Sequence, residues 1–118
     1  MREIKFRAWS KRRNKWVSPM TSFSFVTADL TTEFKDTEEI AYSQYTGLKD
    51  KNGKEIYEGD IVRFGTSGGE DYIGEVRYYE DSASFFVRAE RHYLEYLDDV
   101  YALKVLGNIY ENKELLDE

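Results

Sequence analysis

The sequence predicts a mainly β protein, and two observations support this. Residues 4–9 and 40–46 alternate between two faces with a period of two, which is typical of half-buried strands. The second half of the chain carries about five short strand-like segments in roughly 60 residues, separated by glycine-containing turns. This layout is typical of a small SH3-like β-barrel with one or two short helices. The expected architecture is therefore an N-terminal β-hairpin subdomain followed by such a barrel.

Residues 1–46 are expected to form the N-terminal β-rich subdomain. A first strand over residues 4–9 places Ile4, Phe6 and Ala8 on one face and leads through a turn into a second strand over residues 15–17. A further strand is expected over residues 20–26. Residues 27–39 are acidic and polar without a clear period, which indicates a long loop or a short helix. A strand over 40–46 closes this part.

Residues 47–118 are expected to form the barrel. Asn52-Gly53 is the strongest short turn signal in the chain, and a second turn at residues 58–60 leads into the next strand. Gly74 indicates a bulge or a close approach of another backbone. The expected elements are strands over 61–64, 71–80, 84–90 and 103–109, a glycine-rich loop over 65–69, a short helix or 3₁₀ turn over 92–100, and a final helix over 111–116 capped by Asn112.

Composition excludes several classes of function. The 118 residues include no cysteine, which removes disulfides, thiolate zinc sites, iron–sulfur clusters and cysteine nucleophiles. His92 is the only histidine, so no histidine pair can bind a metal. No apolar run approaches the length of a membrane span, and the first residues lack the apolar stretch of a signal peptide. A small cytoplasmic domain without a membrane partner is expected.

Charge is distributed unevenly along the chain. Residues 1–16 carry seven basic side chains and one acidic one, a net charge of +6, whereas residues 17–118 carry ten basic and 22 acidic ones, a net charge of −12. Such asymmetry is typical of a surface that contacts an oppositely charged partner. Two interpretations stay open: the basic hairpin binds phosphate or another copy, or its charges are only solvated or paired within the chain.

Candidate catalytic sites are weak in this sequence. Four carboxylates near turns are the candidates for a metal site or an acid–base pair, and they are Glu58, Asp60, Glu70 and Asp71. Ser84, His92 and Asp98 lack the sequence around a nucleophile that a hydrolase triad requires. The loop over residues 65–69 lacks the lysine and spacing of a phosphate-binding loop. We therefore expect a non-enzymatic protein with no catalytic residue, metal or cofactor.

Outward-facing aromatic side chains are a better lead. If Tyr72, Gly74, Val76 and Tyr78 face the barrel interior with Phe85, Val87 and Ala89, the opposite face carries Ile73, Tyr79, Phe86 and Arg88. Ile73, Tyr79 and Phe86 would then form an apolar patch of the kind that marks an interface, and Trp9 on the basic face of the first strand fits the same interpretation. The alternative is that the N-terminal subdomain packs over this patch.

The run QYTGLKDKNGKEIYEGDIV over residues 44–62 resembles the signature of the YopX family, small proteins of phages and prophages of Gram-positive bacteria. The opening KFRAW over 5–9 and the ending VLGNIYEN over 105–112 resemble the two ends of that family. One minor departure is Ser10, since the family often has an acidic residue after the tryptophan. The resemblance spans essentially the whole chain. It implies an N-terminal β-rich portion, an SH3-like barrel and a phage or prophage origin, and it implies no activity. Turn formation alone also explains the central run.

Two functions follow from these observations. The first is an interaction or assembly module, which either forms a homo-oligomer with other copies or binds an unknown phage or host protein. The second is a nucleic-acid-binding protein whose basic hairpin contacts phosphate while Trp9 or Trp16 stacks on a base. The candidate partner-binding residues are Trp9, Lys11, Arg12, Arg13, Lys15, Ile73, Tyr79 and Phe86.

Overall fold

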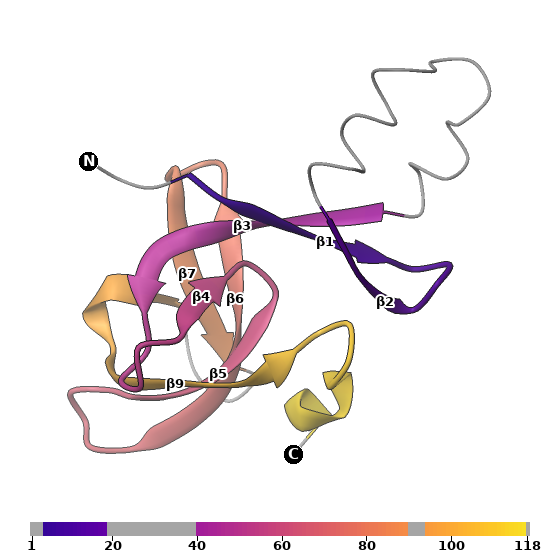
Figure 1. The fold of residues 1–118 in the computed structure, drawn as a ribbon. Coiled ribbons are helices and arrows are strands. Elements are labelled where there is room, and N and C mark those ends of the chain that lie inside the picture. The colour runs from indigo at the N-terminus through magenta and orange to yellow at the C-terminus, as the bar shows by residue number, and fades with distance from the viewer. Residues whose placement is uncertain (1–3, 19–39, 90–93, 118) are drawn as a thin grey trace. The chain divides into compact units, whose positions relative to one another are not determined.

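The computed structural model describes residues 4–18, 40–89 and 94–117, and these residues form a mainly β structure, which confirms the predicted fold class (Figure 1). The expected strand over 20–26 and the acidic segment over 27–39 lie outside the described residues. The strands are β1 (Phe6–Ser10), β2 (Lys15–Val17), β3 (Ile40–Lys49), β4 (Glu55–Tyr57), β5 (Asp60–Gly65), β6 (Asp71–Tyr79), β7 (Ser84–Ala89), β8 (Glu95–Tyr96) and β9 (Tyr101–Asn108). Two 3₁₀ helices, η1 (Leu97–Asp99) and η2 (Lys113–Asp117), complete the fold.

One sheet has the strand order β2-β1-β3-β4, and its strands pair antiparallel. The first half of β3 pairs with β1, so that Ala8 lies opposite Tyr42, and the second half pairs with β4, where Tyr45 lies opposite Tyr57. Contacts divide the chain into a unit ending at Gln44 and a unit beginning at Tyr45. Because β3 runs through this point, a division into two domains after residue 46 stays a prediction.

The second sheet has the order β8-β7-β6-β5-β9, and it is antiparallel throughout. Its strands curl into a half-barrel in which β8 and β9 are the two ends of the order (Figure 1). Gly74 in β6 lies opposite both Val62 and Ala89, and the ladder runs through it without a bulge. A Cβ atom at this position would lie 2.6 Å from the carbonyl oxygen of Arg88, which confirms the predicted close approach.

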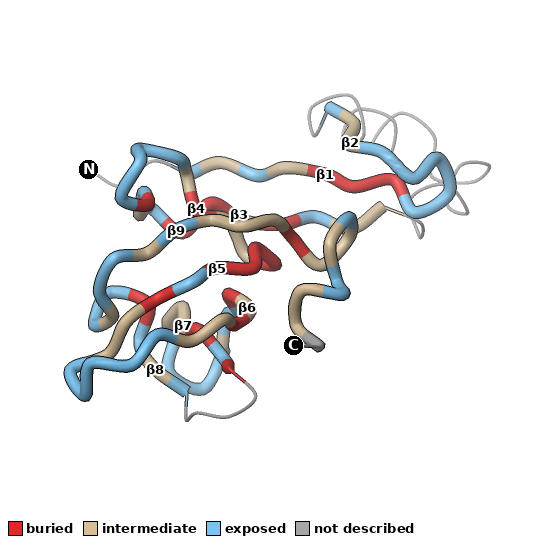
Figure 2. The backbone as a smooth tube through the Cα atoms, turned by 90° about the horizontal axis from the view of Figure 1, so that it is seen from below, coloured by how far each residue is buried: buried red, intermediate tan, exposed pale blue. Residues whose placement is uncertain are grey.

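The core of the half-barrel comes from one face of this sheet. Val62 and Phe64 of β5 are fully buried with Val76 of β6 and Val87 of β7, as the alternation predicts, and Figure 2 shows β5 buried along most of its length. Leu97 of η1 belongs to the same cluster. So does Ile56 of β4, a strand that the sequence did not predict.

The turn between β3 and β4 covers the outer edge of β9. Asp50 is buried, and its carboxylate accepts hydrogen bonds from the N–H groups of Asn52 and Lys54 at one oxygen and of Val105 at the other, each at 2.9 Å. The N–H of Lys51 donates to the carbonyl of Leu103. Gly53 has φ +85°, a conformation that glycine adopts without strain, as the predicted Asn52-Gly53 turn requires.

The two segments expected to be helical differ from the prediction in detail. Residues 95–96 form the short strand β8, and only Leu97–Asp99 form the 3₁₀ turn. The final helix is also 3₁₀ and follows Asn112. The side-chain oxygen of Asn112 accepts from the N–H of Asn108 at 3.2 Å, so the expected helix-capping role is corrected to one that ties the helix back to the end of β9.

Candidate functional site

Three aromatic rings lie side by side on the outer face of β6, β7 and β8. The ring of Phe86 stacks on that of Tyr96, with centroids 4.5 Å apart and planes inclined by 30°. Tyr79 contacts Phe86 edge to face with centroids 5.1 Å apart. Phe86 and Tyr96 are directly opposite in the ladder, so strand register creates the stack. We call Tyr79, Phe86 and Tyr96 the aromatic face.

The aromatic face is partly accessible and carries a cation beside it. Tyr96 is 46% exposed, whereas Phe86 and Tyr79 are half-buried, because each packs against its neighbours. Arg77 lies opposite Phe86 in the ladder, and its guanidinium is 6.0 Å from the centre of the Tyr79 ring. The same guanidinium approaches the carboxylate of Glu75 at 4.0 Å.

Exposed carboxylates follow two members of the aromatic face in sequence. Glu80 and Asp81 directly follow Tyr79 in the turn between β6 and β7. Asp98 and Asp99 lie in η1, immediately beyond Tyr96 and the buried Leu97. We call these four residues the acidic rim. Aromatic surface bordered by like charges favours partners that bring the opposite charge.

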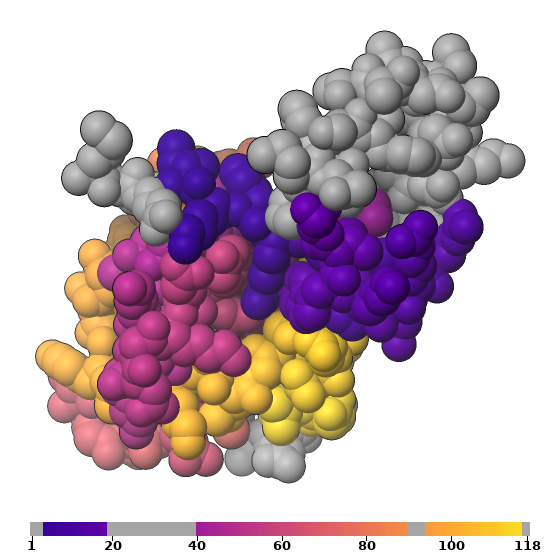
Figure 3. Space-filling model, in the orientation of Figure 1, coloured from indigo at the N-terminus to yellow at the C-terminus, as the bar shows by residue number. Residues whose placement is uncertain are grey.

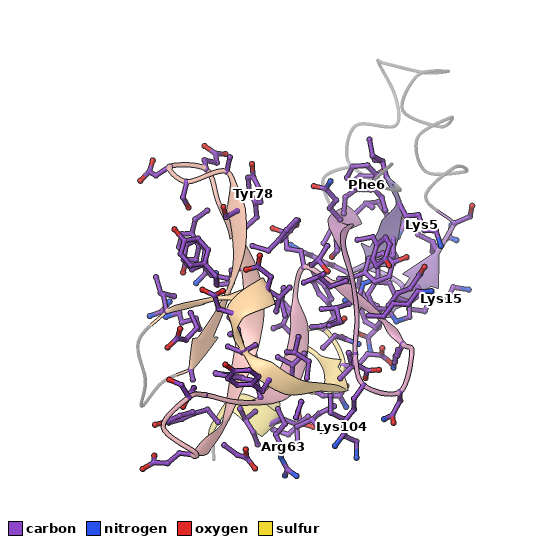
Figure 4. All side chains as sticks on the ribbon, turned by 90° about the vertical axis from the view of Figure 1, so that its left-hand side faces the viewer. Lys5, Phe6, Lys15, Arg63, Tyr78 and Lys104 are labelled. Atoms are coloured by element: carbon purple, nitrogen blue, oxygen red, sulfur yellow. The ribbon has the colours of Figure 1, made fainter. Side chains whose placement is uncertain are left out.

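Two sequence predictions about this sheet need correction. Ile73 faces outward as predicted but is six residues from Tyr79 on β6, about 20 Å in an extended strand, and lies opposite Arg63. It is therefore not part of the aromatic face. Tyr78 was expected inside the barrel but is 40% exposed, because it lies near the end of the β6–β7 hairpin, where it contacts Phe85 edge to face (Figure 4).

Tyr96 is the member of the aromatic face that the sequence analysis missed. The spacing of apolar residues in 92–100 favoured a helix, in which Tyr96 has no defined relation to Phe86. Its position depends on the pairing of β8 with β7, a contact between segments that are not adjacent in sequence. No pattern in the sequence itself places Tyr96 beside Phe86.

The β1–β2 hairpin presents a compact basic tip. Its turn, Lys11–Asn14, is fixed at Ser10, whose carbonyl accepts from the N–H of Asn14 at 2.8 Å and whose hydroxyl accepts from the N–H of Arg13 at 3.1 Å. Asn14 has φ +56°, which asparagine tolerates better than most residues. The side chains of Lys11, Arg12, Arg13 and Lys15 are exposed, and Figures 3 and 4 show the hairpin surface and the outward direction of Lys15. We call these four residues the basic tip.

Trp9 does not lie on the accessible surface of the hairpin. It is only 5% exposed and packs edge to face on Trp16, the residue directly opposite in the ladder, with centroids 5.0 Å apart. The guanidinium of Arg7 lies 4.4 Å from the centre of the Trp16 ring. Of Ile4, Phe6 and Ala8, which were expected on one face of a half-buried strand, only Ala8 is buried, and Ile4 and Phe6 are exposed. These two residues lie before the stretch from Ala8 to Ser10 that pairs with β2.

Two of the four candidate catalytic carboxylates make hydrogen bonds within the fold. Asp60 is buried, and its carboxylate accepts from the N–H of Tyr57 at 2.8 Å across the Glu58-Gly59 turn. Glu70 accepts a hydrogen bond from the phenol of Tyr72 at 2.9 Å, which raises the pKa of that phenol above its ordinary value. Asp71 is exposed. Among the residues that the structure describes, no three acidic or histidine side chains gather in a way that could hold a metal ion.

The remaining candidates have simple outcomes. Ser84 donates its hydroxyl to the carbonyl of Ser82 in the β6–β7 turn, and His92, the base of the hypothetical triad, lies outside the described residues. Residues 66–70 connect β5 to β6, one residue later than the expected loop over 65–69, and a hydrogen bond from the N–H of Thr66 to the carbonyl of Glu70 closes this connection. In the described part of the chain, no helix has the length and apolar character needed to cross a membrane.

Comparison with known proteins identifies the family. The model of the YopX protein family matches residues 5–117. The crystal structure of protein EF1440 from Enterococcus faecalis is similar over 98% of this chain and 99% of that one, with a TM-score of 0.67 and 28% sequence identity. No curated protein matches the chain. Because the family model covers nearly every residue, the chain belongs to the YopX family.

Proposed function

We propose that the protein is a non-catalytic interaction module of a phage or prophage, which acts in the cytoplasm of the bacterial host and binds a protein partner through its aromatic face. The observation that carries this proposal is the row of three contacting rings on three adjacent strands, with Tyr96 46% exposed. Membership of the YopX family supports the phage or prophage origin.

The aromatic face has the composition and the preorganised side chains of a binding surface. Aromatic residues and arginine are enriched in the centres of protein interfaces because they bury large areas and lose little conformational freedom. The mutual contacts of Tyr79, Phe86 and Tyr96 already restrict their side chains before any partner arrives. The buried or bonded states of Asp50 and Asp60 support a non-catalytic role, since both carboxylates are engaged by backbone N–H groups of the fold.

Site-specific photo-crosslinking in the bacterial host tests the proposal. A photoreactive phenylalanine analogue replaces Tyr96 in one variant and Tyr101 in a matched control. Tyr101 is more exposed, at 60%, but lies on β9, away from the aromatic face in the strand order. We expect a discrete protein adduct from position 96 that is absent from position 101. The adduct should also be lost when Phe86→Ser is added.

The proposal has two contrary results. One is the absence of any adduct at position 96 above the level at position 101. The other is an adduct that persists unchanged in the Phe86→Ser background, since removal of the central ring should disrupt the surface that Tyr79 and Tyr96 complete. Circular dichroism of purified Phe86→Ser provides the control that the variant is still folded.

A further inference from the structure

We infer that the partner of the aromatic face is the basic tip of a second copy of this chain, so that copies associate head to tail. This inference rests on the proposed function and adds the identity of the occupant. It joins two surfaces that each copy carries once, and heterologous contacts of that kind produce rings or open chains rather than an isologous dimer.

Charge complementarity is the first argument for this occupant. Residues 4–18 contain six basic side chains and no acidic one: Lys5, Arg7, Lys11, Arg12, Arg13 and Lys15. The four exposed carboxylates of the acidic rim lie next to the aromatic face in sequence and outnumber Arg77 and Arg88, the two exposed cations of β6 and β7. Opposite charges at the border of an interface speed encounter and fix orientation. Two aromatic faces packed directly on each other would instead bring two acidic rims together, and repulsion between their carboxylates opposes that arrangement.

The chemistry of the two surfaces is the second argument. Arg12 and Arg13 are exposed and lie in a turn that Ser10 holds by two hydrogen bonds, so the backbone of this part of the basic tip is defined. Guanidinium groups pack on aromatic rings and pair with carboxylates at the same time. Arg77 already contacts Tyr79 in this way within one chain, at 6.0 Å. The exposed ring of Tyr96 offers a second such contact to a neighbouring copy.

Nucleic-acid phosphate is the competing ligand for the basic tip. The remainder of the chain argues against it, because residues 17–118 carry a net charge of −12 and would repel a polyanion. Of the two side chains expected to stack on a base, Trp9 is 5% exposed, and Trp16 is half-buried between Trp9 and the guanidinium of Arg7. The same charge that repels phosphate attracts the basic tip of another copy, and we therefore favour self-association.

A charge-swap experiment with the full-length chain tests the inference. The first variant is Arg12→Glu/Arg13→Glu, and the second is Glu80→Lys/Asp81→Lys; the side chains of all four positions are exposed. The matched control is Arg63→Glu/Lys104→Glu, which changes the net charge as the first variant does. Those two cations lie opposite each other on β5 and β9 and extend on the same side of that sheet (Figure 4).

The readout is native mass by light scattering at about 50 mM and about 500 mM salt, because exposed ion pairs weaken as screening increases. We expect the wild type and the control to exceed the 13.9 kDa of one chain at low salt. Each swap variant alone should associate at least about tenfold more weakly. A mixture of the two should regain the wild-type mass, since each tip then faces a rim of opposite charge. A second rim variant, Asp98→Lys/Asp99→Lys, should behave like the first.

Four results would overturn the inference: a wild type of 13.9 kDa at both salt concentrations, equal weakening by the control, a mixture that does not regain mass with either rim variant, or an Arg12→Glu/Arg13→Glu variant that keeps its mass and loses only binding to a short DNA duplex. The last result would assign the basic tip to nucleic acid. A position-96 adduct with a different protein would preserve the proposed function while this inference fails.

Discussion

At the scale of single residues, Asp50 explains much of the long turn-rich run in the middle of the sequence. Its carboxylate joins the N–H groups of the β3–β4 turn to the N–H of Val105, which lies 55 residues away in sequence. Burial alone would raise the pKa of Asp50. The hydrogen bonds from Val105, Lys54 and Asn52, with the charge of Lys54, outweigh burial and hold the pKa below its ordinary value of 3.8.

This shift predicts a stability that depends on acid. Because the pKa in the folded state is depressed, the stabilisation by Asp50 is fully present above about pH 4 and is lost as the pH falls through the folded-state value. Asp50→Asn should cost about 2–3 kcal/mol at pH 7, since its amide places a donor against one of the backbone N–H groups. Urea unfolding measured from about pH 2.5 to about pH 7 gives the free energy of unfolding of both proteins. The difference between wild type and Asp50→Asn should shrink below pH 3.8.

The control for that experiment is Asp81→Asn, an exposed carboxylate in the β6–β7 turn. Its substitution should change the free energy of unfolding by less than about 0.5 kcal/mol at any pH. A cost of Asp50→Asn that stays constant as the pH falls would contradict the role assigned to the ionised carboxylate.

Gly74 carries a second residue-scale prediction. An added methyl group would meet the carbonyl oxygen of Arg88 at 2.6 Å and its carbon at 2.8 Å, and both belong to the backbone of a paired strand that cannot easily move. Gly74→Ala should therefore cost about 2–3 kcal/mol in thermal or urea unfolding. Gly68→Ala, where the nearest atom is the Thr66 hydroxyl at 3.7 Å, is the control and should change stability little. Similar costs for both would refute this explanation.

At the scale of elements, the sequence predicted the long strands and the three-residue β2, but neither β4 nor β8. Alternation of residue types identified β1, β3, β6 and β7, and the buried residues repeat every second position in β6 and β7, whereas Ala8, Trp9 and Ser10 of β1 are all buried. β4 and β8 have three and two residues, too few for a period, and exist through pairing with distant segments. The basic tip was predictable from its charges, whereas the aromatic face required the position of β8.

The direction of the Trp9 side chain could not be predicted from the alternation of residue types. Trp9 was placed on the accessible face of the first strand because it alternates with the basic residues Lys5 and Arg7. The structure buries it against Trp16, since β1 lies between β2 and β3 at that point. Alternation reports that two faces differ, and only the neighbouring strands determine which face is covered.

Ile56 is the residue through which β4 is anchored in the core. This central residue of β4 is fully buried and belongs to the core cluster with Val62 and Phe64. Ile56→Ala should cost about 2–5 kcal/mol and Ile56→Val about 0.5–1.5 kcal/mol, in proportion to the volume removed. Urea denaturation measures both. A cost for Ile56→Ala no greater than that for Ile56→Val would mean that β4 is not anchored in the core.

At the scale of the whole molecule, stability should differ between the two sheets. β5 and β6 are each paired on both sides and supply the fully buried Val62, Phe64 and Val76, whereas β2 is an edge strand of three residues. Native-state hydrogen exchange should therefore show the slowest amides in β5 and β6 and much faster exchange in β2 through local opening. Equal protection of β2 and β5 would indicate a single cooperative unit instead.

The continuity of β3 has a consequence for any attempt to trim the protein. A fragment that begins at residue 47, where composition suggests the barrel starts, would lack Tyr45, which lies opposite Tyr57 in the ladder. It would also lack the Thr46 hydroxyl, which donates to the carbonyl of Ile56 at 2.7 Å and accepts from the N–H of Leu48 at 3.2 Å. The shortest fragment that keeps β4 paired therefore has to retain the second half of β3. Because the first half of β3 pairs with β1, a cut after residue 46 divides a strand that belongs to both pairings and does not fall in a linker.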